Sequence, residues 1–253
     1  MPVETLSDRW LRRFVKAPAP RSRLVCFPHA GGSASYYLPV ARALGDIADV
    51  VAVQYPGRQD RRHEPFLPTL ADVADQMLGV AGPLDDLPLV LFGHSMGASI
   101  AFEVAARLEA GGARPAALFA SGRRAPSTHR VETVHKQDDA GLLAEVRDLN
   151  GTDTALLNSD PEFRQMVLPA LRADYRAAET YEWVPGPALG CPIVALRGVD
   201  DPHADEAETL AWQQHTTGGF EMHSFTGGHF FVNDHVAEVI RLVRGRLSAA
   251  AHP

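Results

Sequence analysis

The sequence predicts a fold of the α/β class, in which a mostly parallel central sheet is flanked by helices. Short apolar segments alternate with helical patterns in the first half of the chain, which favours parallel strands joined by helical crossovers. One apolar segment, residues 87–92, runs through a Gly-x-Ser-x-Gly motif directly into a helical pattern. The alternation returns after residue 190, so we expect a single domain over residues 1–253, with a helical insertion between two late strands.

The strands expected in the first half are apolar segments bounded by turn-forming residues. They cover residues 23–28, 49–55, 87–92 and 116–121. Helical patterns lie between them, at residues 35–44, 69–79 and 98–110. The second helical pattern has Leu70, Val73 and Met77 on one side, which is typical of a helix packed on a core. Continuous apolar strands indicate a sheet that is covered on both faces.

The alternation is interrupted at residues 122–187, where we find no clear strand. Helical patterns occupy residues 139–150 and 162–180, with Pro169 inside the second. Roughly sixty residues between two strands are too many for a plain crossover. We therefore expect a helical lid over the active site, and a structural extension of the core is the alternative.

The last quarter of the chain returns to the earlier pattern. Strands are expected at residues 191–197 and 220–225, and helices at residues 204–215 and 236–247. Each of these two strands is followed by a loop that carries candidate catalytic residues. Because parallel strands end at the same edge of a sheet, both loops should lie beside the Gly-x-Ser-x-Gly motif.

Composition narrows the classes of protein to which the chain could belong. The residues are 45% hydrophobic and 22% charged, which is ordinary for a soluble globular protein. No apolar run approaches the ~20 residues of a membrane helix, and the first residues lack the features of a signal peptide. The net charge of −7 argues against non-specific nucleic-acid binding. Cys26 and Cys191 lie in or beside apolar segments, so we expect core thiols of a reduced cytoplasmic protein and no metal site. We also expect the protein to be a monomer.

The motif Gly-His-Ser-Met-Gly at residues 93–97 marks Ser95 as a candidate nucleophile. A serine at a sharp turn from a buried strand into a helix is the setting of a nucleophile elbow. Steric crowding explains why glycine occupies positions 93 and 97, because a strained turn leaves no room for a Cβ on either side of the serine. The alternative is a chance Gly/Ser loop, which the strand and helix on either side disfavour.

A serine hydroxyl becomes an effective nucleophile when a base takes its proton and an acid holds that base. In folds with this elbow the partners follow in the chain order serine, acid, histidine. Asp201 is the candidate acid, because it follows the strand at residues 191–197 and the turn at Gly198. Asp200 is its immediate competitor and Asp205 a distant one, and Asp201 could instead cap the next helix.

The candidate base is His229, in the Gly-rich loop after the last expected strand. Gly227 and Gly228 before it let the backbone bring the imidazole close to the serine. His94 lies in the elbow itself and should point away from the site. The chain has eleven histidines, and the rivals nearest to the candidate residues are His94, His203, His215, His223 and His235.

Hydrolysis through a serine also needs donors for the oxyanion. One is the backbone N–H after the nucleophile, here that of Met96. The other comes from the loop after the first long strand, here the N–H of Ala30 within residues 29–32. A phosphate-binding turn is the alternative, and the absence of a Gly-x-Gly-x-x-Gly pattern weakens it.

Five segments, spread in order over nearly the whole chain, resemble the type II thioesterases of the α/β-hydrolase superfamily. They are residues 27–32 (FPHAGG), 55–58 (YPGR), 92–98 (FGHSMGA), 196–202 (LRGVDDP) and 227–231 (GGHFF). The elbow motif alone is shared with many hydrolases, and its combination with the first two segments is much more specific. Members of this family are stand-alone editing enzymes of polyketide and non-ribosomal peptide synthesis.

The resemblance implies an α/β-hydrolase fold with Ser95, Asp201 and His229 as the triad and with Ala30 and Met96 as oxyanion donors. It also implies that the insert at residues 122–187 is a mobile lid over an acyl chamber. The implied reaction is hydrolysis of an aberrant or stalled acyl thioester, through an acyl-serine and without a cofactor of the enzyme's own. The implied partners are acyl or peptidyl carrier proteins, which bear the acyl group on phosphopantetheine.

Carrier proteins are usually acidic around the modified serine, so docking on a net acidic enzyme needs local positive charge. The candidates are arginines that cluster beside expected loops: Arg58, Arg61, Arg62, Arg123, Arg124 and Arg130. A solvated basic face is the alternative.

Three other classes of protein have the same elbow motif. A terminal thioesterase domain of a synthase would normally follow a carrier domain, and no Leu-Gly-Gly-x-Ser-like attachment site precedes Arg21. A generic esterase or lipase differs by its preference for oxygen esters. A non-catalytic binding protein of the same fold typically lacks a triad member, whereas all three candidates are present here.

Overall fold

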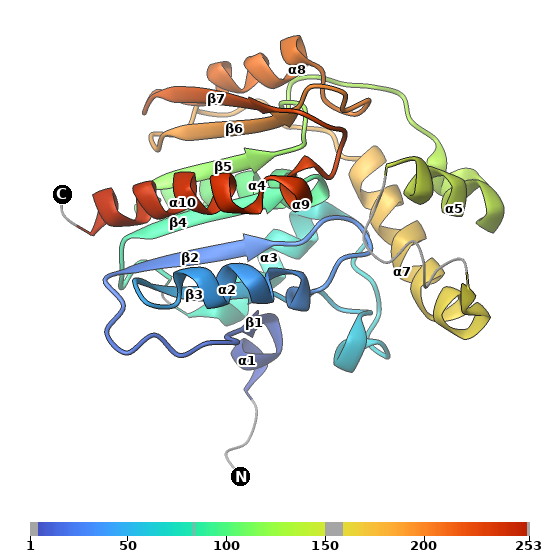
Figure 1. Cartoon of the computed structure of the whole chain (residues 1–253), viewed down its shortest axis with the longest axis horizontal. Helices are drawn as coiled ribbons and strands as arrows, with labels where there is room; N and C mark the ends of the chain where they lie inside the picture. Colours follow the sequence, from blue (N-terminus) through green and yellow to red (C-terminus); the bar gives the residue numbers. More distant parts are fainter. Residues whose placement is uncertain (1–4, 83, 150–158, 252–253) are drawn as a thin grey trace.

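A seven-stranded sheet lies at the centre of the computed structural model, which describes residues 5–82, 84–149 and 159–251 (Figure 1). The strand order is β1-β3-β2-β4-β5-β6-β7. The strands are β1 (Leu11–Arg12), β2 (Ser22–Phe27), β3 (Ala48–Val53), β4 (Leu89–His94), β5 (Ala117–Ser121), β6 (Ile193–Gly198) and β7 (Phe220–Phe225). β1 pairs antiparallel with β3, and the other neighbours pair in parallel. The predicted fold class is confirmed.

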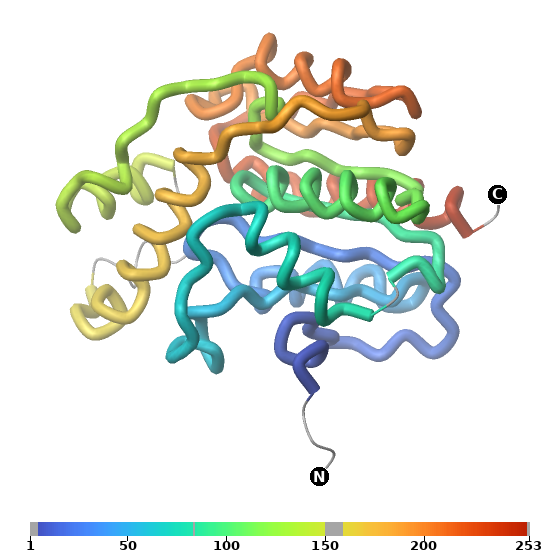
Figure 2. The backbone as a smooth tube through the Cα atoms, turned by 180° about the vertical axis from the view of Figure 1, so that it is seen from behind, coloured from blue at the N-terminus to red at the C-terminus, as the bar shows by residue number. Residues whose placement is uncertain are grey.

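Helices cover both faces of the sheet. α2 (Leu38–Leu44) and α10 (Val236–Ala250) lie on one face, and α3 (Leu70–Ala81) and α4 (Met96–Ala110) lie on the other (Figures 1 and 2). Every residue of β2, β3 and β4 is consequently buried. This coverage explains why these strands are largely apolar without alternation.

The centre of the sheet is a point where neighbouring strands feed helices on opposite faces. β2 and β4 are paired, β2 leads into α2 on one face, and β4 leads into α4 on the other (Figures 1 and 2). Two loops diverge at such a point and leave a crevice at the carboxyl ends of the strands. The predicted elbow and the predicted oxyanion loop are these two loops.

Between β5 and β6 the chain leaves the sheet, and its helices project beyond the carboxyl ends of the strands (Figure 1). In the described part of this segment they are the 3-10 turn η3 (Val134–Lys136), α5 (Asp139–Asp148) and α7 (Pro161–Glu179). α5 and α7 share a small apolar cluster around Leu142, Val146 and Leu171. The helix predicted at residues 139–150 is present through Asp148, and its last residue lies outside the described part of the chain.

Short elements account for most differences from the prediction. α1 (Leu6–Trp10) and β1 were not predicted, because elements of five and two residues are too short to show periodicity. The predicted helix at residues 204–215 divides into α8 (Glu206–Leu210) and the 3-10 turn η4 (Ala211–His215). The terminal helix continues past Leu247 to Ala250. The remaining elements are η1 (Ala34–Tyr37), η2 (Gln59–Arg61) and α9 (Phe231–Asp234).

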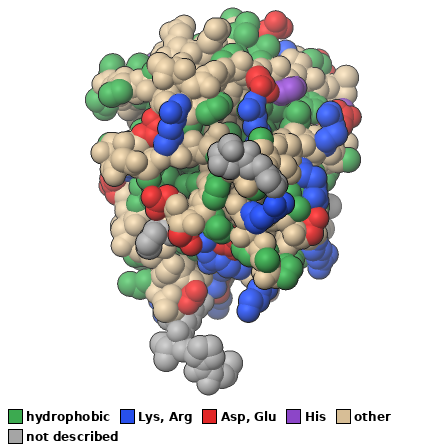
Figure 3. All heavy atoms as spheres, turned by 90° about the vertical axis from the view of Figure 1, so that its left-hand side faces the viewer, with side chains coloured by type: hydrophobic (Ala, Val, Ile, Leu, Met, Phe, Trp, Pro, Cys, Tyr) green, Lys and Arg blue, Asp and Glu red, His purple; other side chains and the backbone are tan. Residues whose placement is uncertain are grey.

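The surface opposite the insert mixes basic and acidic side chains with apolar ones (Figure 3). Cys26 and Cys191 are buried free thiols, as the sequence predicts. Among the helices of the described residues, none is long and apolar enough to cross a membrane.

Candidate active site

Ser95 lies at the turn between β4 and α4, at the carboxyl end of the central strand. Its backbone has φ 55° and ψ −123°, a conformation that is rare for a residue with a side chain. A Cβ on Gly93 would lie 2.2 Å from the Gly97 carbonyl oxygen, and a Cβ on Gly97 would lie 2.0 Å from that of Phe27. The steric reason predicted for both glycines is therefore confirmed, and the turn is a nucleophile elbow.

Three side chains from separate loops form one hydrogen-bonded line. The Ser95 hydroxyl lies 2.8 Å from Nε2 of His229, to which it can donate its proton. Nδ1 of His229 lies 2.9 Å from Oδ2 and 3.0 Å from Oδ1 of Asp201. The Asp201 side chain is fully buried and that of His229 nearly so. A carboxylate in this position fixes the imidazole tautomer whose Nε2 faces the serine.

The structure places Asp201, and not Asp200, against the histidine. Asp200 is exposed, and its backbone N–H bonds to the carbonyl of Gly227. Asp205 caps α8 through a capping box with Glu208, so capping is the role of Asp205 rather than of Asp201. Asp201 also accepts the backbone N–H of His203 at 2.9 Å, which holds the carboxylate in place.

The rival histidines have other partners in the described structure. Nε2 of His215 lies 2.9 Å from the Ser127 hydroxyl, and Nε2 of His235 lies 3.1 Å from the Thr226 hydroxyl. His223 lies beside the carboxylate of Glu221. Among the described residues, His229 is the histidine that contacts the Ser95 hydroxyl.

The prediction that His94 points away from the site is wrong. Its ring lines the same cavity as Ser95, and its centroid lies 5.2 Å from that of His229. Its Nδ1 lies 2.9 Å from the Ser121 hydroxyl. Burial lowers the pKa of His94 well below its ordinary value, and burial followed by the nearby His229 lowers that of His29 to about 3. Both neighbours therefore stay neutral, so that they do not repel a positive charge on His229.

The loop at residues 29–32 forms a tight turn beside the elbow. The Gly32 N–H donates to the His29 carbonyl at 2.9 Å, and Gly31 has φ 73°, as in a type II turn. The hydrogen bonds found among the described residues use the amides of Gly31 and Gly32 and leave that of Ala30 available. The Met96 N–H lies in the first turn of α4, where helix amides have no intrahelical partner.

A cavity of about 590 Å³ opens onto Ser95, and both candidate oxyanion donors line it. One wall is apolar and comes from α7, with Phe163, Val167 and Leu171. Further apolar side chains come from α2, α9 and α10. The lining also includes the charged residues Arg123, Glu132 and Glu179. A cavity with an extended apolar wall beside polar groups suits a ligand that has both a hydrocarbon part and a polar part.

Three of the six arginines predicted to dock a carrier are buried, which does not fit that role. Arg58 is 7% exposed, Arg61 5% and Arg124 5%. Arg61 pairs with Glu64 and lies over the Trp10 ring at 4.5 Å. Buried guanidinium groups with internal partners cannot present charge to another protein, so the docking prediction is wrong for these three.

The other three arginines differ in their surroundings. Arg123 lines the cavity and donates to the Ser99 hydroxyl and to the Ala178 carbonyl, both at 3.1 Å. Arg130 is half-buried and pairs with Glu208 at 2.6 Å. Arg62 is exposed on the turn after η2, which makes it the candidate that fits a docking surface best.

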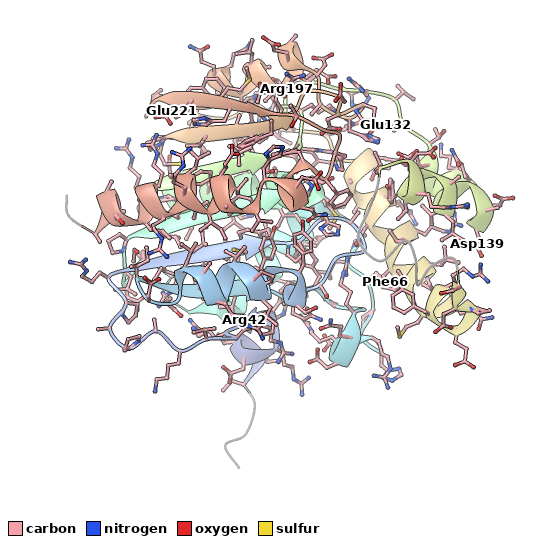
Figure 4. All side chains as sticks on the ribbon, in the orientation of Figure 1. Arg42, Phe66, Glu132, Asp139, Arg197 and Glu221 are labelled. Atoms are coloured by element: carbon pink, nitrogen blue, oxygen red, sulfur yellow. The ribbon has the colours of Figure 1, made fainter. Side chains whose placement is uncertain are left out.

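His203 links the loop of Asp201 to the helical insert. Its Nε2 lies 2.9 Å from Glu145 of α5, and its Nδ1 lies 3.4 Å from Glu132, which Figure 4 labels between the sheet and α5. Glu132 also pairs with Arg124. Burial opposes the charged imidazole, but hydrogen bonds to the two carboxylates outweigh it and raise the pKa of His203 to about 9.

We expect the free energy of unfolding to fall as the pH rises from about 6.5 towards about 9, by up to about 3 kcal/mol through His203. The folded protein binds this proton more tightly than the unfolded chain does, so the stabilisation is complete below the unfolded pKa and is lost as the pH passes the folded one. Urea unfolding across this range measures the effect. A His203→Gln variant with the same pH profile as the wild type would contradict the assignment.

Sequence reasoning missed His203 and Asp174 as residues of the site region. His203 appeared only as a rival base, because its carboxylate partners lie far away in the sequence. Asp174 carried a weak signal, since it lies on the same side of its helix as Leu171 and Ala170 and shares their burial. A charged residue on the apolar side of a helix is a marker that could have singled it out.

The fold and the hydrogen-bonded serine, histidine and aspartate together define a serine hydrolase of the α/β-hydrolase class. The family model of the thioesterase domain matches residues 22–247, and the chain belongs to this thioesterase family. It is accordingly an enzyme that hydrolyses thioesters.

Individual relatives agree with this family. The chain is 51% identical over 255 residues to the "Probable cadicidin biosynthesis thioesterase" of Streptomyces griseus, a match that covers 100% of this chain and 69% of the relative. It is 47% identical over 240 residues to thioesterase PikA5 of Streptomyces venezuelae, covering 94% and 85% of the two chains. The type II thioesterase BorB from the borrelidin biosynthetic cluster superimposes with a TM-score of 0.89 at 48% identity, covering 96% and 99%. The resemblance to type II thioesterases is thus confirmed.

Proposed function

We propose that this thioesterase removes stalled or aberrant acyl groups from the phosphopantetheine arm of carrier proteins in polyketide or non-ribosomal peptide synthesis. The observation that carries the proposal is the Ser95–His229–Asp201 line in a cavity with an apolar wall. The biosynthetic setting is supported by the names of the relatives, which include a cadicidin biosynthesis thioesterase and a thioesterase of the borrelidin cluster.

In this proposal each residue of the site has one role. Ser95 Oγ attacks the thioester carbon while Nε2 of His229 takes the hydroxyl proton, and Asp201 stabilises the imidazolium. The amides of Ala30 and Met96 donate to the oxyanion of the tetrahedral intermediate. His229 then returns the proton to the departing thiol, which leaves an acyl-serine. Water attacks this ester with His229 again as the base, and the free acid and the Ser95 hydroxyl are restored.

The insert at residues 122–187 acts as the lid in this proposal. Its helix α7 supplies the apolar side chains that wall the cavity above Ser95. A covered cavity excludes water from the acyl chain and holds the thioester beside the nucleophile. The enzyme needs no cofactor of its own, because the pantetheine thiol arrives with the substrate. The monomeric state and the cytoplasmic location stay predictions.

The proposed function is tested by offering one acyl group on three leaving groups: a carrier protein, a pantetheine thiol and an alcohol of similar shape. We expect kcat/KM to be at least about tenfold higher for the thioesters, because a thiol with a pKa of about 8.5 leaves more readily than an alcohol. Turnover of the oxygen ester that equals or exceeds that of the thioesters would indicate a generic esterase instead.

The same substrates test docking at Arg62. The Arg62 guanidinium lies 3.4 Å from the carbonyl of Gln59, and the Gln59 amide bonds to Ser33 and Ser35 at the cavity. Arg62→Glu should therefore raise KM for the acidic carrier severalfold and leave the pantetheine substrate unchanged. Equal effects on both substrates, or no effect on either, would exclude docking at this residue.

A further inference from the structure

Helix α7 of the insert contacts the turn at residues 29–32 through two side chains. Oδ2 of Asp174 accepts the backbone N–H of Gly31 at 2.7 Å. Leu171 lies one turn earlier on the same side of the helix, and a Cβ on Gly31 would lie 2.7 Å from its Cδ2 atom. Asp174 is 7% exposed and Leu171 3%. Gly31 is thus covered by α7 and, with φ 73°, could not be replaced without strain.

Arg58 links this contact to the loop that follows β3. Its Nη2 pairs with Oδ2 of Asp174, its Nε donates to the Gly32 carbonyl at 3.0 Å, and its Nη1 donates to the Pro56 carbonyl at 2.7 Å. The guanidinium also lies over the Tyr55 ring at 4.9 Å. A buried ion pair costs desolvation free energy, which such additional hydrogen bonds offset. The pair therefore ties the loop after β3, the turn at residues 29–32 and α7 into one unit.

The bond from Gly31 to Asp174 selects one orientation of the turn. The central peptide of this turn joins the Ala30 carbonyl to the Gly31 N–H, and it is the peptide that flips between type I and type II turns. A carboxylate accepts an N–H and repels a carbonyl oxygen, so Asp174 favours the observed orientation. Arg58 holds the carbonyl of Gly32, which lies two peptides further along the turn. The backbone that follows the Ala30 N–H is therefore held at the peptide between residues 30 and 31 by Asp174 and at the peptide between residues 32 and 33 by Arg58.

We propose that Asp174 and Arg58 are positioning residues that hold the Ala30 N–H in the oxyanion hole and make the hole depend on the docking of α7. When α7 lies on the core, Asp174 completes the turn and the site is competent. When α7 is displaced, the turn loses the acceptor that orients it, so that an uncovered site hydrolyses poorly. This inference rests on the proposed function, because it assigns the coupling of the lid to the same oxyanion hole.

The test uses two changes at Asp174 and one at Arg58. Asp174→Ala should lower kcat for an acyl-pantetheine by about 10²-fold, the scale of losing one oxyanion donor, with KM changed by less than about threefold. Asp174→Asn keeps an acceptor for Gly31 but loses the charge that pairs with Arg58, so its loss should be about tenfold. Arg58→Lys should lie between these values, because a lysine cannot hold three acceptors in one plane.

The matched control is Asp139→Asn. Asp139 lies on α5, where Figure 4 labels it, and pairs with Arg172 of α7 at 2.7 Å. This change also removes an ion pair of α7, but one within the insert and exposed, so hydrolysis should keep its wild-type rate. Thermal midpoints of all variants show whether the fold is retained.

Two ligands distinguish the proposed positioning role of Asp174 from a purely structural role. An alkylboronic acid forms a tetrahedral adduct on Ser95 and depends on the oxyanion hole, whereas an S-alkyl-pantetheine thioether has no carbonyl to attack and only occupies the cavity. The inference predicts that boronate affinity falls in parallel with kcat while thioether affinity is unchanged. It is overturned if both affinities fall together, or if Asp174→Ala retains the wild-type kcat. A failure of the proposed function appears separately, in the wild type, as turnover of the oxygen ester that equals or exceeds that of the thioesters.

Discussion

Replacing Ser95 by alanine should lower kcat for acyl-pantetheine hydrolysis by about 10⁶-fold, the scale at which a triad serine acts in another serine hydrolase. The reason is that the Ser95 hydroxyl is the group that His229 activates, at 2.8 Å, and no second hydroxyl is hydrogen-bonded to this imidazole among the described residues. Release of the pantetheine thiol, followed with a chromogenic thiol reagent, measures the rate. The residual rate should reflect the oxyanion donors and binding alone.

Ser127→Ala is the matched control for this change. Ser127 also bonds to a histidine, with its hydroxyl 2.9 Å from Nε2 of His215, but neither residue lines the cavity of Ser95. We expect this variant to retain wild-type activity. If the Ser95 variant hydrolysed the substrate at the wild-type rate, or if both variants lost activity equally, Ser95 would not be the nucleophile.

Asp201→Asn should lower kcat by about 10⁴-fold, because an amide no longer fixes the imidazole tautomer or stabilises its charged form. Asp200→Asn is the control, since that neighbouring side chain is exposed and lies outside the hydrogen-bonded line. Both variants are assayed with the same acyl-pantetheine. Their thermal midpoints are measured as well, to show that each variant retains the fold. A larger loss at Asp200 than at Asp201 would reverse the assignment.

The elbow could be predicted from sequence because its determinants are local. A buried strand, two glycines and a helix follow one another within about twenty residues, and the clash that demands each glycine is set by its own turn. The base could be found for a similar reason, since His229 follows a strand end and a Gly-rich loop. The acid could be narrowed to Asp200 or Asp201, but the choice depends on which side of the loop faces His229.

Long-range pairs could not be predicted in the same way. Arg58 appeared as a docking residue because it belongs to a basic segment, yet its partner Asp174 lies 116 residues further along the chain. Arg124 was misjudged in part for the same reason: Glu132 lies near it in the sequence, but the His203 carbonyl that it also contacts lies 79 residues further along the chain. Local charge density describes a segment before folding, whereas burial depends on contacts between segments that are far apart in the sequence.

The central claim is that Ser95 carries the acyl group between a carrier thiol and water. Acid quenching of the wild-type enzyme during the first turnover of an acyl-carrier substrate, followed by peptide mass spectrometry, tests it most directly. We predict an added acyl mass on the peptide that contains Ser95, absent in Ser95→Ala. An adduct on another residue, or release of the free acid with no adduct at any quench time, would contradict the mechanism.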